Sequence, residues 1–166
     1  MGISLVPDYI FDKFDLASAE FLSSIGVRGI VLDIDNTLEP YENPTPGEHV
    51  VRWLSELNAC GIKAAFVSNN NSKRVNKFNE SLCLPAYPNG AKPFKHNVLR
   101  AMRDMGTDSS STALMGDQIF TDVWAARNAG IKAILVSPIK DKKDPFTRFK
   151  RVLENVFINK YEKRKL

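Results

Sequence analysis

Short, uninterrupted apolar runs recur along the chain, and each of them ends at a polar residue. Four such runs have the sequences GIVL, KAAFV, TALMG and KAILV, at residues 29–32, 63–67, 112–116 and 132–136. Apolar runs of this length that do not alternate with polar positions are typical of strands buried on both faces of a sheet. The pattern therefore predicts four strands that belong to a parallel sheet.

Segments with helical spacing lie between these runs. Thr45, Pro46 and Glu48 predict the start of a helix, because they supply a cap, a proline at the first helical position and an acid three residues after the cap. Apolar residues then recur at helical spacing until Gly61, which is a typical helix end. Further helices are expected over residues 72–79, from Pro93 to about Met105, and over TDVWAARNAG at residues 121–130.

Strands that alternate with helices indicate right-handed βαβ units. We therefore expect an α/β fold with a three-layer, Rossmann-like, doubly wound parallel sheet. Residues 1–139 are expected to form this single domain. An apolar segment near the N-terminus, VPDYIFDKF at residues 6–14, is either part of the core or a contact surface. Residues 140–166 are expected to form an appended C-terminal helix.

The composition is typical of a soluble globular protein. The chain has 166 residues, of which 43% are hydrophobic and 25% are charged, and this length suits one domain. No apolar run approaches the roughly 20 residues of a membrane-spanning helix, and the N-terminal residues lack the pattern of a secretion signal. Cys60 and Cys83 belong to no CxxC motif and are expected to be small buried hydrophobes in a reducing compartment. The expected location is therefore the cytoplasm.

The basic charge of the chain is concentrated in its C-terminal segment. Residues 140–166 contain ten Lys and Arg residues and four Asp and Glu residues, a net charge of +6, whereas residues 1–139 have a net charge of −2. Apolar side chains recur at helical spacing in the same segment, at positions that include Phe146, Phe149, Val156, Phe157 and Tyr161. Such a basic amphipathic helix either packs on the core with a solvated basic face or attaches to an anionic membrane.

Polar side chains that suit catalysis follow the predicted strands. Asp33, Ser68 and Asp117 each come directly after a strand. In an open α/β sheet, ligands bind at the carboxyl ends of the strands, so these residues are expected to meet at one site. Asp35 and Asp122 would add two more acids to it. Carboxylates gathered in one crevice need a cation, and oxygen ligands suit a hard ion such as Mg²⁺.

The same site offers groups for an anionic substrate. Ser68 and the amide of Asn69 can donate hydrogen bonds to phosphate oxygens, and Lys92 can supply a compact positive charge. Simpler explanations exist for each residue taken alone. A turn or a helix cap would explain residues 35–37, a plain loop would explain the serine and the asparagine, and a solvated surface position would explain the lysine. None of them explains why acids recur at successive strand ends.

Four segments taken together resemble a known family. DIDNT, VSNN, AKP and GDQIFTD occur in the order and at the secondary-structure positions of the haloacid dehalogenase superfamily of phosphohydrolases, and the resemblance covers about residues 25–140. Each segment alone is a weak signal, whereas all four in register are specific. The closer likeness is to the YqeG-like branch of that superfamily, which is related to mitochondrial phosphatidylglycerophosphate phosphatase.

The resemblance implies a role for each acid. Asp33 corresponds to the nucleophile that forms an aspartyl-phosphate, and Asp35 corresponds to the acid that protonates the leaving alcohol and then deprotonates water. Mg²⁺ would be held by Asp33, the backbone carbonyl of Asp35, and Asp117. Asp122 would support this metal site.

The resemblance also implies a phosphate site. Ser68, together with Asn69, would bind the transferred phosphoryl group, and Lys92 would offset its charge. The sequence departs from the family pattern in the helix that follows GDQIFTD, where Trp124 and Arg127 stand at positions at which small glycines are expected. This departure affects the expected shape of the pocket rather than the metal chemistry.

The intervals between the motifs are too short for the cap domain that many members of the superfamily carry. Six residues separate Leu38 from Thr45, and 21 residues lie between Asn70 and Lys92. A capless haloacid dehalogenase fold has an open site, and an open site suits a phosphate attached to something large. The likeness to the branch related to phosphatidylglycerophosphate phosphatase, together with the open site and the basic C-terminal segment, implies phosphatidylglycerophosphate as the favoured substrate. Peripheral contact with the inner face of an anionic membrane is the corresponding expectation.

Two other functions stay open. The first keeps the chemistry but replaces the lipid by a small soluble phosphate ester or by the end phosphate of a nucleic acid, although no aromatic-rich basic groove for a nucleic acid is evident. The second is a non-catalytic surface-binding protein on a phosphatase fold, which would be expected to have lost a catalytic carboxylate. A small substrate would need closure from elsewhere, such as a neighbouring subunit, and the sequence does not determine the oligomeric state.

Overall fold

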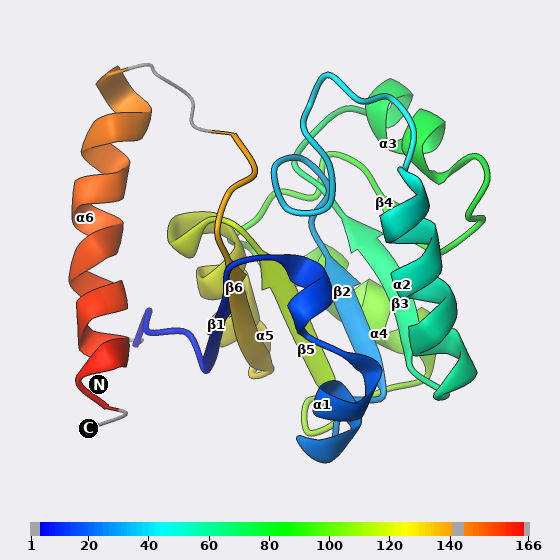
Figure 1. Cartoon of the computed structure of the whole chain (residues 1–166), viewed down its shortest axis with the longest axis horizontal. Coiled ribbons are helices and arrows are strands. Elements are labelled where there is room, and N and C mark those ends of the chain that lie inside the picture. The colour runs from blue at the N-terminus through cyan, green and yellow to red at the C-terminus, as the bar shows by residue number, and fades with distance from the viewer. Residues whose placement is uncertain (1–3, 141–144, 165–166) are drawn as a thin grey trace.

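The computed structural model describes residues 4–140 and 145–164, and it describes the side chains of the last helix from Val152 onward. A six-stranded parallel sheet with the order β1-β6-β5-β2-β3-β4 forms its centre, and helices cover both faces (Figure 1). The strands are β1 (Tyr9–Phe11), β2 (Gly29–Leu32), β3 (Lys63–Val67), β4 (Ala86–Tyr87), β5 (Thr112–Gly116) and β6 (Lys132–Val136). The expected α/β, Rossmann-like fold is confirmed.

The helices occupy the connections between the strands. They are α1 (Ala19–Ser24), α2 (Glu48–Ala59), α3 (Ser72–Asn79), α4 (His96–Met105), α5 (Trp124–Ala129) and α6 (Pro145–Glu162). A 3-10 turn, η1 (Phe14–Leu16), precedes α1, and a π-helical turn, η2 (Ile119–Val123), precedes α5. Between β2 and α4, a stretch that is described throughout, the chain forms α2, β3, α3, β4 and their loops, without a separate cap domain.

The predicted strands are β2, β3, β5 and β6, and they have the expected bounds. Their residues alternate between two cores on opposite faces of the sheet. In β2, Ile30 and Leu32 pack with residues of α1 and α2, whereas Val31 packs with residues of α4 and α5. Burying one aliphatic side chain of this size stabilises a fold by about 1.5–3 kcal/mol. Because both faces are covered, the inner positions of such a strand are apolar, and polar residues such as Lys63 and Lys132 are found at its first position.

The two edge strands were not predicted from the sequence. β4 pairs with the end of β3 over only two residues, and β1 lies in the N-terminal apolar segment beside β6. Tyr9 and Phe11 pack edge-to-face on Phe21 of α1, each with ring centroids 5.1 Å apart. Ile10 packs on the opposite face of the sheet. The N-terminal segment is therefore part of the core.

The start of α2 differs from the prediction. The helix begins at Glu48 with Gly47 as its cap, so the predicted start at Thr45 and Pro46 is wrong. The reason is the buried carboxylate of Glu39, which accepts a hydrogen bond from the N–H of Gly47 at 2.8 Å. This bond holds the preceding residues in the loop.

The start of α4 also lies later than predicted. α4 begins at His96 rather than at Pro93, because the backbone of Lys92 is tied to the side chain of Asn69 by two hydrogen bonds of 2.8 and 3.0 Å. The helix expected over residues 121–130 is present, and its first part belongs to the π-helical turn η2 while α5 proper begins at Trp124.

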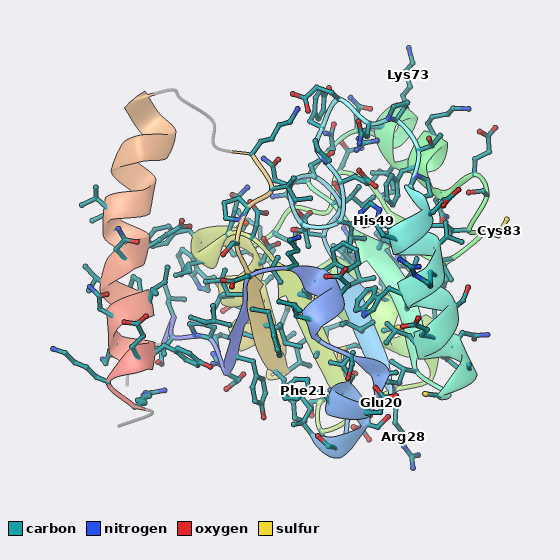
Figure 2. The ribbon with its side chains drawn as sticks, in the orientation of Figure 1. Glu20, Phe21, Arg28, His49, Lys73 and Cys83 are labelled. Carbon is teal, nitrogen blue, oxygen red and sulfur yellow. The ribbon has the colours of Figure 1, made fainter. Side chains whose placement is uncertain are left out.

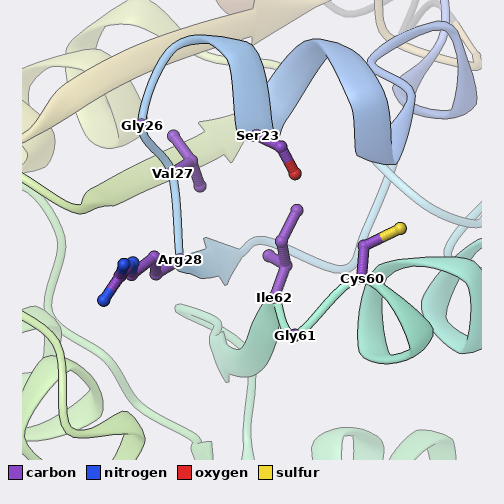
Figure 3. A pocket seen from close by; sticks show the side chains of 7 residues that line it. All are labelled: Ser23, Gly26, Val27, Arg28, Cys60, Gly61 and Ile62. Atoms are coloured by element: carbon purple, nitrogen blue, oxygen red, sulfur yellow. The ribbon is translucent and has the colours of Figure 1, made fainter.

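Both cysteines are exposed, so the expectation that they are buried is wrong. Cys60 ends α2 and lines an open hollow together with Arg28 and Gly61 (Figure 3). Cys83 lies in the turn after α3 and has a φ of 53°. Both residues occupy connections rather than the apolar face of an element, which explains their exposure.

The described side chains of α6 contact the core through one side of the helix. Phe157 packs edge-to-face on Phe120 with ring centroids 6.0 Å apart, and Tyr161 is buried. Glu154 accepts a hydrogen bond from the N–H of Ile119 at 3.0 Å. This side of α6 therefore packs on the core. Packing on the core was one of the two alternatives expected for the C-terminal segment.

The opposite side of α6 is exposed. Val152, Leu153 and Val156 are 64%, 42% and 61% exposed. They are accompanied by the exposed basic residues Lys160, Lys163 and Arg164. α6 runs opposite to the strands, so its C-terminal end, which carries Lys160, Lys163 and Arg164, lies near the amino edge of the sheet (Figure 1). The expected positions of Phe146 and Phe149 lie outside the described side chains. No helix in the described part of the chain has the length and apolar content needed to cross a membrane.

Candidate active site

The acids expected from the strand ends meet at the carboxyl edge of the sheet. Asp33 follows β2 and Asp117 follows β5, and these two strands are neighbours in the sheet. The turn η2 brings Asp122 back to the same place. One carboxylate oxygen from each of the three acids lies within 4.8 Å of the other two, and all three residues are buried. We call Asp33, Asp117 and Asp122 the acid cluster.

Gly116 allows the side chain of Asp122 to come very close to the end of β5. A Cβ atom at this position would lie 2.2 Å from Cγ of Asp122, which is far closer than real Cβ contacts. The N–H of Gln118 donates a hydrogen bond of 3.1 Å to Oδ2 of Asp122 and holds the returning chain. The glycine of GDQIFTD is therefore required by the close approach of the Asp122 side chain.

Lys92 lies between two members of the acid cluster. Its buried Nζ is 2.8 Å from Oδ1 of Asp33 and 2.6 Å from Oδ1 of Asp122. Burial disfavours the charged amine, but the carboxylates of Asp122 and Asp33 outweigh this effect and raise the pKa of Lys92 above its ordinary value. The lysine is therefore a fixed positive charge within the site.

The acid cluster carries more negative charge than Lys92 balances. Burial, followed by the charges of Asp122 and Asp35, raises the pKa of Asp33 to about 6, although Lys92 opposes this shift. Burial and the charges of Asp33 and Asp122 raise the pKa of Asp117 well above its ordinary range. Each carboxylate would ionise more readily if a cation were present.

The donor set of the acid cluster suits a hard cation. Its members offer oxygen atoms, and Mg²⁺ prefers oxygen ligands and keeps several waters. The hydroxyl of Thr37 lies 3.3 Å from Oδ2 of Asp33 and 3.2 Å from Oδ1 of Asp117, so it donates between the two acids. These residues therefore fit a magnesium ion. Thr37 was not among the expected site residues, although its position four residues after Asp33 could have indicated it.

Asp35 is close in sequence to Asp33 but its carboxylate is held elsewhere. Oδ1 accepts a hydrogen bond from Nε of Arg74 at 2.9 Å, and Nη2 of Arg74 is also 2.9 Å from it. Oδ2 accepts from the side-chain amide of Asn70 at 2.9 Å. Donors around the start of α3 therefore hold both oxygens of the Asp35 carboxylate, and the backbone carbonyl of Asp35 is the group left for the expected metal contact.

Ser68 and Asn69 both lie at the end of β3, but they differ in what they hold. Ser68 is buried, and its hydroxyl oxygen accepts the N–H of Asn70 at 3.1 Å. The side chain of Asn69 accepts the N–H of Lys92 at 2.8 Å and donates to its carbonyl at 3.0 Å. Both polar atoms of that side chain are therefore occupied by the backbone of Lys92. The backbone N–H of Asn69 is the group left for a phosphate contact, and this contact stays a prediction.

Trp124 and Arg127, the two departures from the family pattern, lie outside the acid cluster. Trp124 is 37% exposed. Nη1 of Arg127 is 2.9 Å from Oδ2 of Asp8, and Nη2 donates to the carbonyl of Val6. Arg127 therefore anchors the segment that leads into β1 and does not contact the acids.

A Rossmann-like sheet with buried acids, one lysine and an oxygen-rich cation site at its carboxyl edge is suited to hydrolysis of an anionic ester. The family model of haloacid dehalogenase-like hydrolases matches residues 30–136. The chain is also 34% identical over 149 residues to "Probable phosphatase YqeG" of Bacillus subtilis (strain 168), and this match covers 90% of the chain and 87% of that protein. The chain therefore belongs to the haloacid dehalogenase-like hydrolase family.

More distant matches agree with this assignment. A phosphoglycolate phosphatase of Caulobacter vibrioides is 31% identical over 103 residues, which are 57% of this chain and 42% of that protein. The cobalt-bound deoxy-D-mannose-octulosonate 8-phosphate phosphatase of Haemophilus influenzae superposes with a TM-score of 0.54 at 14% identity, over 67% of this chain and 68% of that chain. An uncharacterised protein of Listeria monocytogenes superposes with a TM-score of 0.54 at 15% identity, over 72% of this chain and 85% of that chain. These structural similarities concern the fold alone.

Proposed function

We propose that this chain, a phosphatase of the haloacid dehalogenase type, hydrolyses a phosphate monoester through an aspartyl-phosphate on Asp33 and uses Mg²⁺ as its cofactor. The observation that carries the proposal is the position of Asp33. Its carboxylate lies at the end of β2, 2.8 Å from Nζ of Lys92 and within the acid cluster. An anionic nucleophile can approach a phosphate only where positive charge offsets the repulsion.

The chain supplies the groups for both halves of the reaction. An oxygen of Asp33 forms a bond to phosphorus while the bond from phosphorus to the alcohol oxygen breaks, and Asp35 gives that oxygen a proton. Asp35 then takes a proton from a water molecule that attacks the aspartyl-phosphate, which releases phosphate and regenerates Asp33. Ser68 donates to the phosphoryl oxygens, and Lys92 balances their charge. Mg²⁺, when bound, would add positive charge at the phosphoryl oxygens.

The ligands proposed for Mg²⁺ are Asp33, Asp117 and the backbone carbonyl of Asp35. Asp122 has a supporting role, because Lys92 holds its Oδ1 at 2.6 Å and the N–H of Gln118 holds its Oδ2 at 3.1 Å. Its two oxygens are thus already engaged, whereas Asp117 is held by the weaker hydroxyl contact of Thr37.

Hydrolysis of p-nitrophenyl phosphate tests the mechanism. The purified chain should release nitrophenol with Mg²⁺, and excess EDTA should abolish the activity. Asp33→Asn should be inactive although folded, because an amide cannot form the acyl phosphate. Asp12→Asn, which changes an exposed acid, is the matched control and should keep full activity. Undiminished turnover by Asp33→Asn would contradict the covalent mechanism.

Phosphatidylglycerophosphate is the substrate that we propose. The sequence resembles the branch related to the mitochondrial phosphatase for this lipid, and no cap domain lies between β2 and α4 to enclose a small molecule. The exposed apolar and basic residues of α6 support peripheral contact with an anionic membrane at its inner face.

A small soluble ester is the second candidate. Two relatives are named as phosphatases of such compounds, the phosphoglycolate phosphatase and a glyceraldehyde 3-phosphate phosphatase of Pyrococcus abyssi that is 22% identical over 136 residues. Comparing kcat/KM for phosphatidylglycerophosphate in mixed micelles with kcat/KM for phosphoglycolate and glyceraldehyde 3-phosphate discriminates between the two. Preference for the lipid is expected, and preference for either soluble ester would replace it as the substrate.

A further inference from the structure

We infer that Arg74 of α3 is the positioning residue of Asp35, the group that exchanges the proton in the proposed reaction. This inference rests on the proposed role of Asp35 and adds to it a residue outside the four family segments. It follows from the number and direction of the contacts that the guanidinium makes.

The guanidinium of Arg74 holds Asp35 at a single oxygen. Nε and Nη2 both lie 2.9 Å from Oδ1 of Asp35. Asn70 donates to the other oxygen at 2.9 Å. Three donors from the segment around the start of α3 therefore fix the orientation of the carboxylate. The side chain of Asp35 is 20% exposed, so it stays accessible to a substrate.

The same guanidinium also binds the loop that follows Asp35. Nη1 donates to the carbonyl of Asn43 at 2.7 Å, and Nη2 donates more weakly to the carbonyl of Pro40 at 3.5 Å. The ring of Tyr41 lies 5.8 Å from Cζ, and the ring of Phe78 lies 5.4 Å from it. Arg74 is thus held by the loop and by its own helix while it holds Asp35.

Only an arginine fits this set of contacts. A guanidinium has five N–H donors in a rigid plane and can stack on aromatic rings, whereas a lysine amine is a point charge on a flexible stem. The side chain of Arg74 is 8% exposed, so water cannot replace the missing donors easily. Buried ion pairs of this kind add little net stability compared with well-packed apolar side chains, so net stability does not account for this pair, whereas the orientation of Asp35 does.

Orientation matters most when the leaving group needs a proton. A general acid contributes about 10²–10⁴-fold to the rate, and a displacement of about 1 Å can remove roughly 10²-fold. A leaving group that departs readily as an anion depends little on the acid. Loss of Arg74 should therefore slow the hydrolysis of a basic leaving group selectively.

Phenyl phosphate and p-nitrophenyl phosphate make a matched pair of probes, because they have similar shapes and differ in the basicity of the leaving group. We compare kcat/KM, which reports only the steps up to departure of the alcohol. In Arg74→Gln with Mg²⁺ present, kcat/KM for phenyl phosphate should fall by roughly 10–100-fold. The value for p-nitrophenyl phosphate should fall much less. Lys73→Gln is the control, since Lys73 is the neighbour on α3 that points into solvent (Figure 2).

A double-mutant cycle separates positioning from general support of the fold. In the background of Asp35→Asn there is no proton donor to orient, so adding Arg74→Gln should change the phenyl phosphate rate little further. Equal losses for both esters, or an equal effect of Arg74→Gln with and without Asp35, would overturn the inference. If Arg74→Gln does not fold, Arg74→Lys provides the same comparison and should change the ratio of the two esters in the same direction.

The two levels of the proposal fail differently. A parent protein that hydrolyses neither aryl ester, or an Asp33→Asn variant that keeps its activity, would overturn the proposed function and the role of Arg74 with it. An active parent with an inactive Asp33→Asn variant, combined with an unchanged ester ratio in Arg74→Gln, would overturn the role of Arg74 alone.

Discussion

At the scale of single residues, the acid cluster is a place where folding and function oppose each other. Asp117 has a buried carboxylate next to Asp33 and Asp122, and its direct donor is the hydroxyl of Thr37. Burial of like charges disfavours ionisation, which is why its pKa is raised. Such a group binds a proton more tightly in the folded state than in the unfolded state. Stability therefore falls as the pH rises through the window between the two pKa values.

Replacing this charge should stabilise the metal-free protein. Asp117→Asn keeps the shape of the side chain and can still accept from Thr37, so in EDTA at pH 7 its thermal midpoint should rise by a few degrees, the scale of about 1 kcal/mol. The gain should shrink as the pH falls, because the raised pKa lets the carboxyl of the parent take up a proton at a higher pH than an ordinary Asp does. Adding Mg²⁺ should raise the midpoint of the parent and raise that of the variant much less.

Thermal unfolding measured with EDTA and with Mg²⁺ checks this prediction, and Asp12→Asn serves as the exposed control. A metal-free Asp117→Asn variant that is less stable than the parent at pH 7 would show that the carboxylate is well satisfied without a cation. An equal response of both proteins to Mg²⁺ would remove Asp117 from the ligand set.

At the scale of elements, continuous apolar runs determined the four inner strands, because both faces of each are covered. The edge strand β4 has two residues and β1 has three, too few for a periodic pattern. Helix starts were less predictable, since the start of α2 depends on a hydrogen bond that the N–H of its cap residue donates to Glu39, eight positions earlier in the sequence. The acids at the strand ends were predictable from the local sequence, because each follows directly after one of these apolar runs.

Local sequence patterns did not predict the contacts that join distant segments of the chain at the site. Asn69 holds Lys92 across 23 residues, and Arg74 holds Asp35 across 39. The sequence did carry one sign of the second contact. Arg74 is placed four residues before Phe78 on the buried side of α3, where a charged residue needs a partner.

The contact between α6 and the turn η2 leads to a prediction at this scale. Glu154 accepts the N–H of Ile119 at 3.0 Å, between Asp117 and Asp122 in the sequence. Glu154→Ala leaves that N–H without this acceptor and should lower the free energy of unfolding by about 1–2 kcal/mol. Because η2 positions Asp122, kcat/KM for p-nitrophenyl phosphate should fall several-fold.

Glu162→Ala is the matched control, since Glu162 is an exposed acid at the end of the same helix. Chemical unfolding and steady-state kinetics on the two variants make the comparison. If Glu154→Ala is as active and as stable as Glu162→Ala, α6 does not support the active site.

At the scale of the whole molecule, the site and the C-terminal end of α6 lie at opposite ends of the sheet (Figure 1). A bilayer that touched only Lys160, Lys163 and Arg164 would therefore not face the acid cluster directly. The exposed Val152 and Val156 lie along the same helix, so the molecule would meet the surface with the length of α6.

Neutralising the three basic residues at the C-terminal end of α6 tests this contact with a membrane. Each basic residue near an anionic surface contributes about 1 kcal/mol, so changing Lys160, Lys163 and Arg164 to Gln should weaken binding to vesicles that contain phosphatidylglycerol by up to roughly 10²-fold at low salt. The difference in vesicle binding between the parent and this variant should become smaller as salt is added, because salt at 0.1 M screens charges beyond about 10 Å. Hydrolysis of p-nitrophenyl phosphate should be unchanged, because none of the three residues contacts the acid cluster.

The matched variant removes three lysines from the opposite end of the molecule. Lys73, Lys95 and Lys140 are exposed near the carboxyl edge of the sheet, and their replacement by Gln should affect vesicle binding less than the α6 variant does. Co-sedimentation with vesicles and turnover of embedded phosphatidylglycerophosphate measure the two effects in parallel. If the site-edge variant loses binding and the α6 variant keeps it, the bilayer meets the active-site edge and α6 is a solvated cover of the core. If neither variant changes binding or turnover, the basic residues have no part in recognising the substrate, and a soluble ester becomes the better candidate.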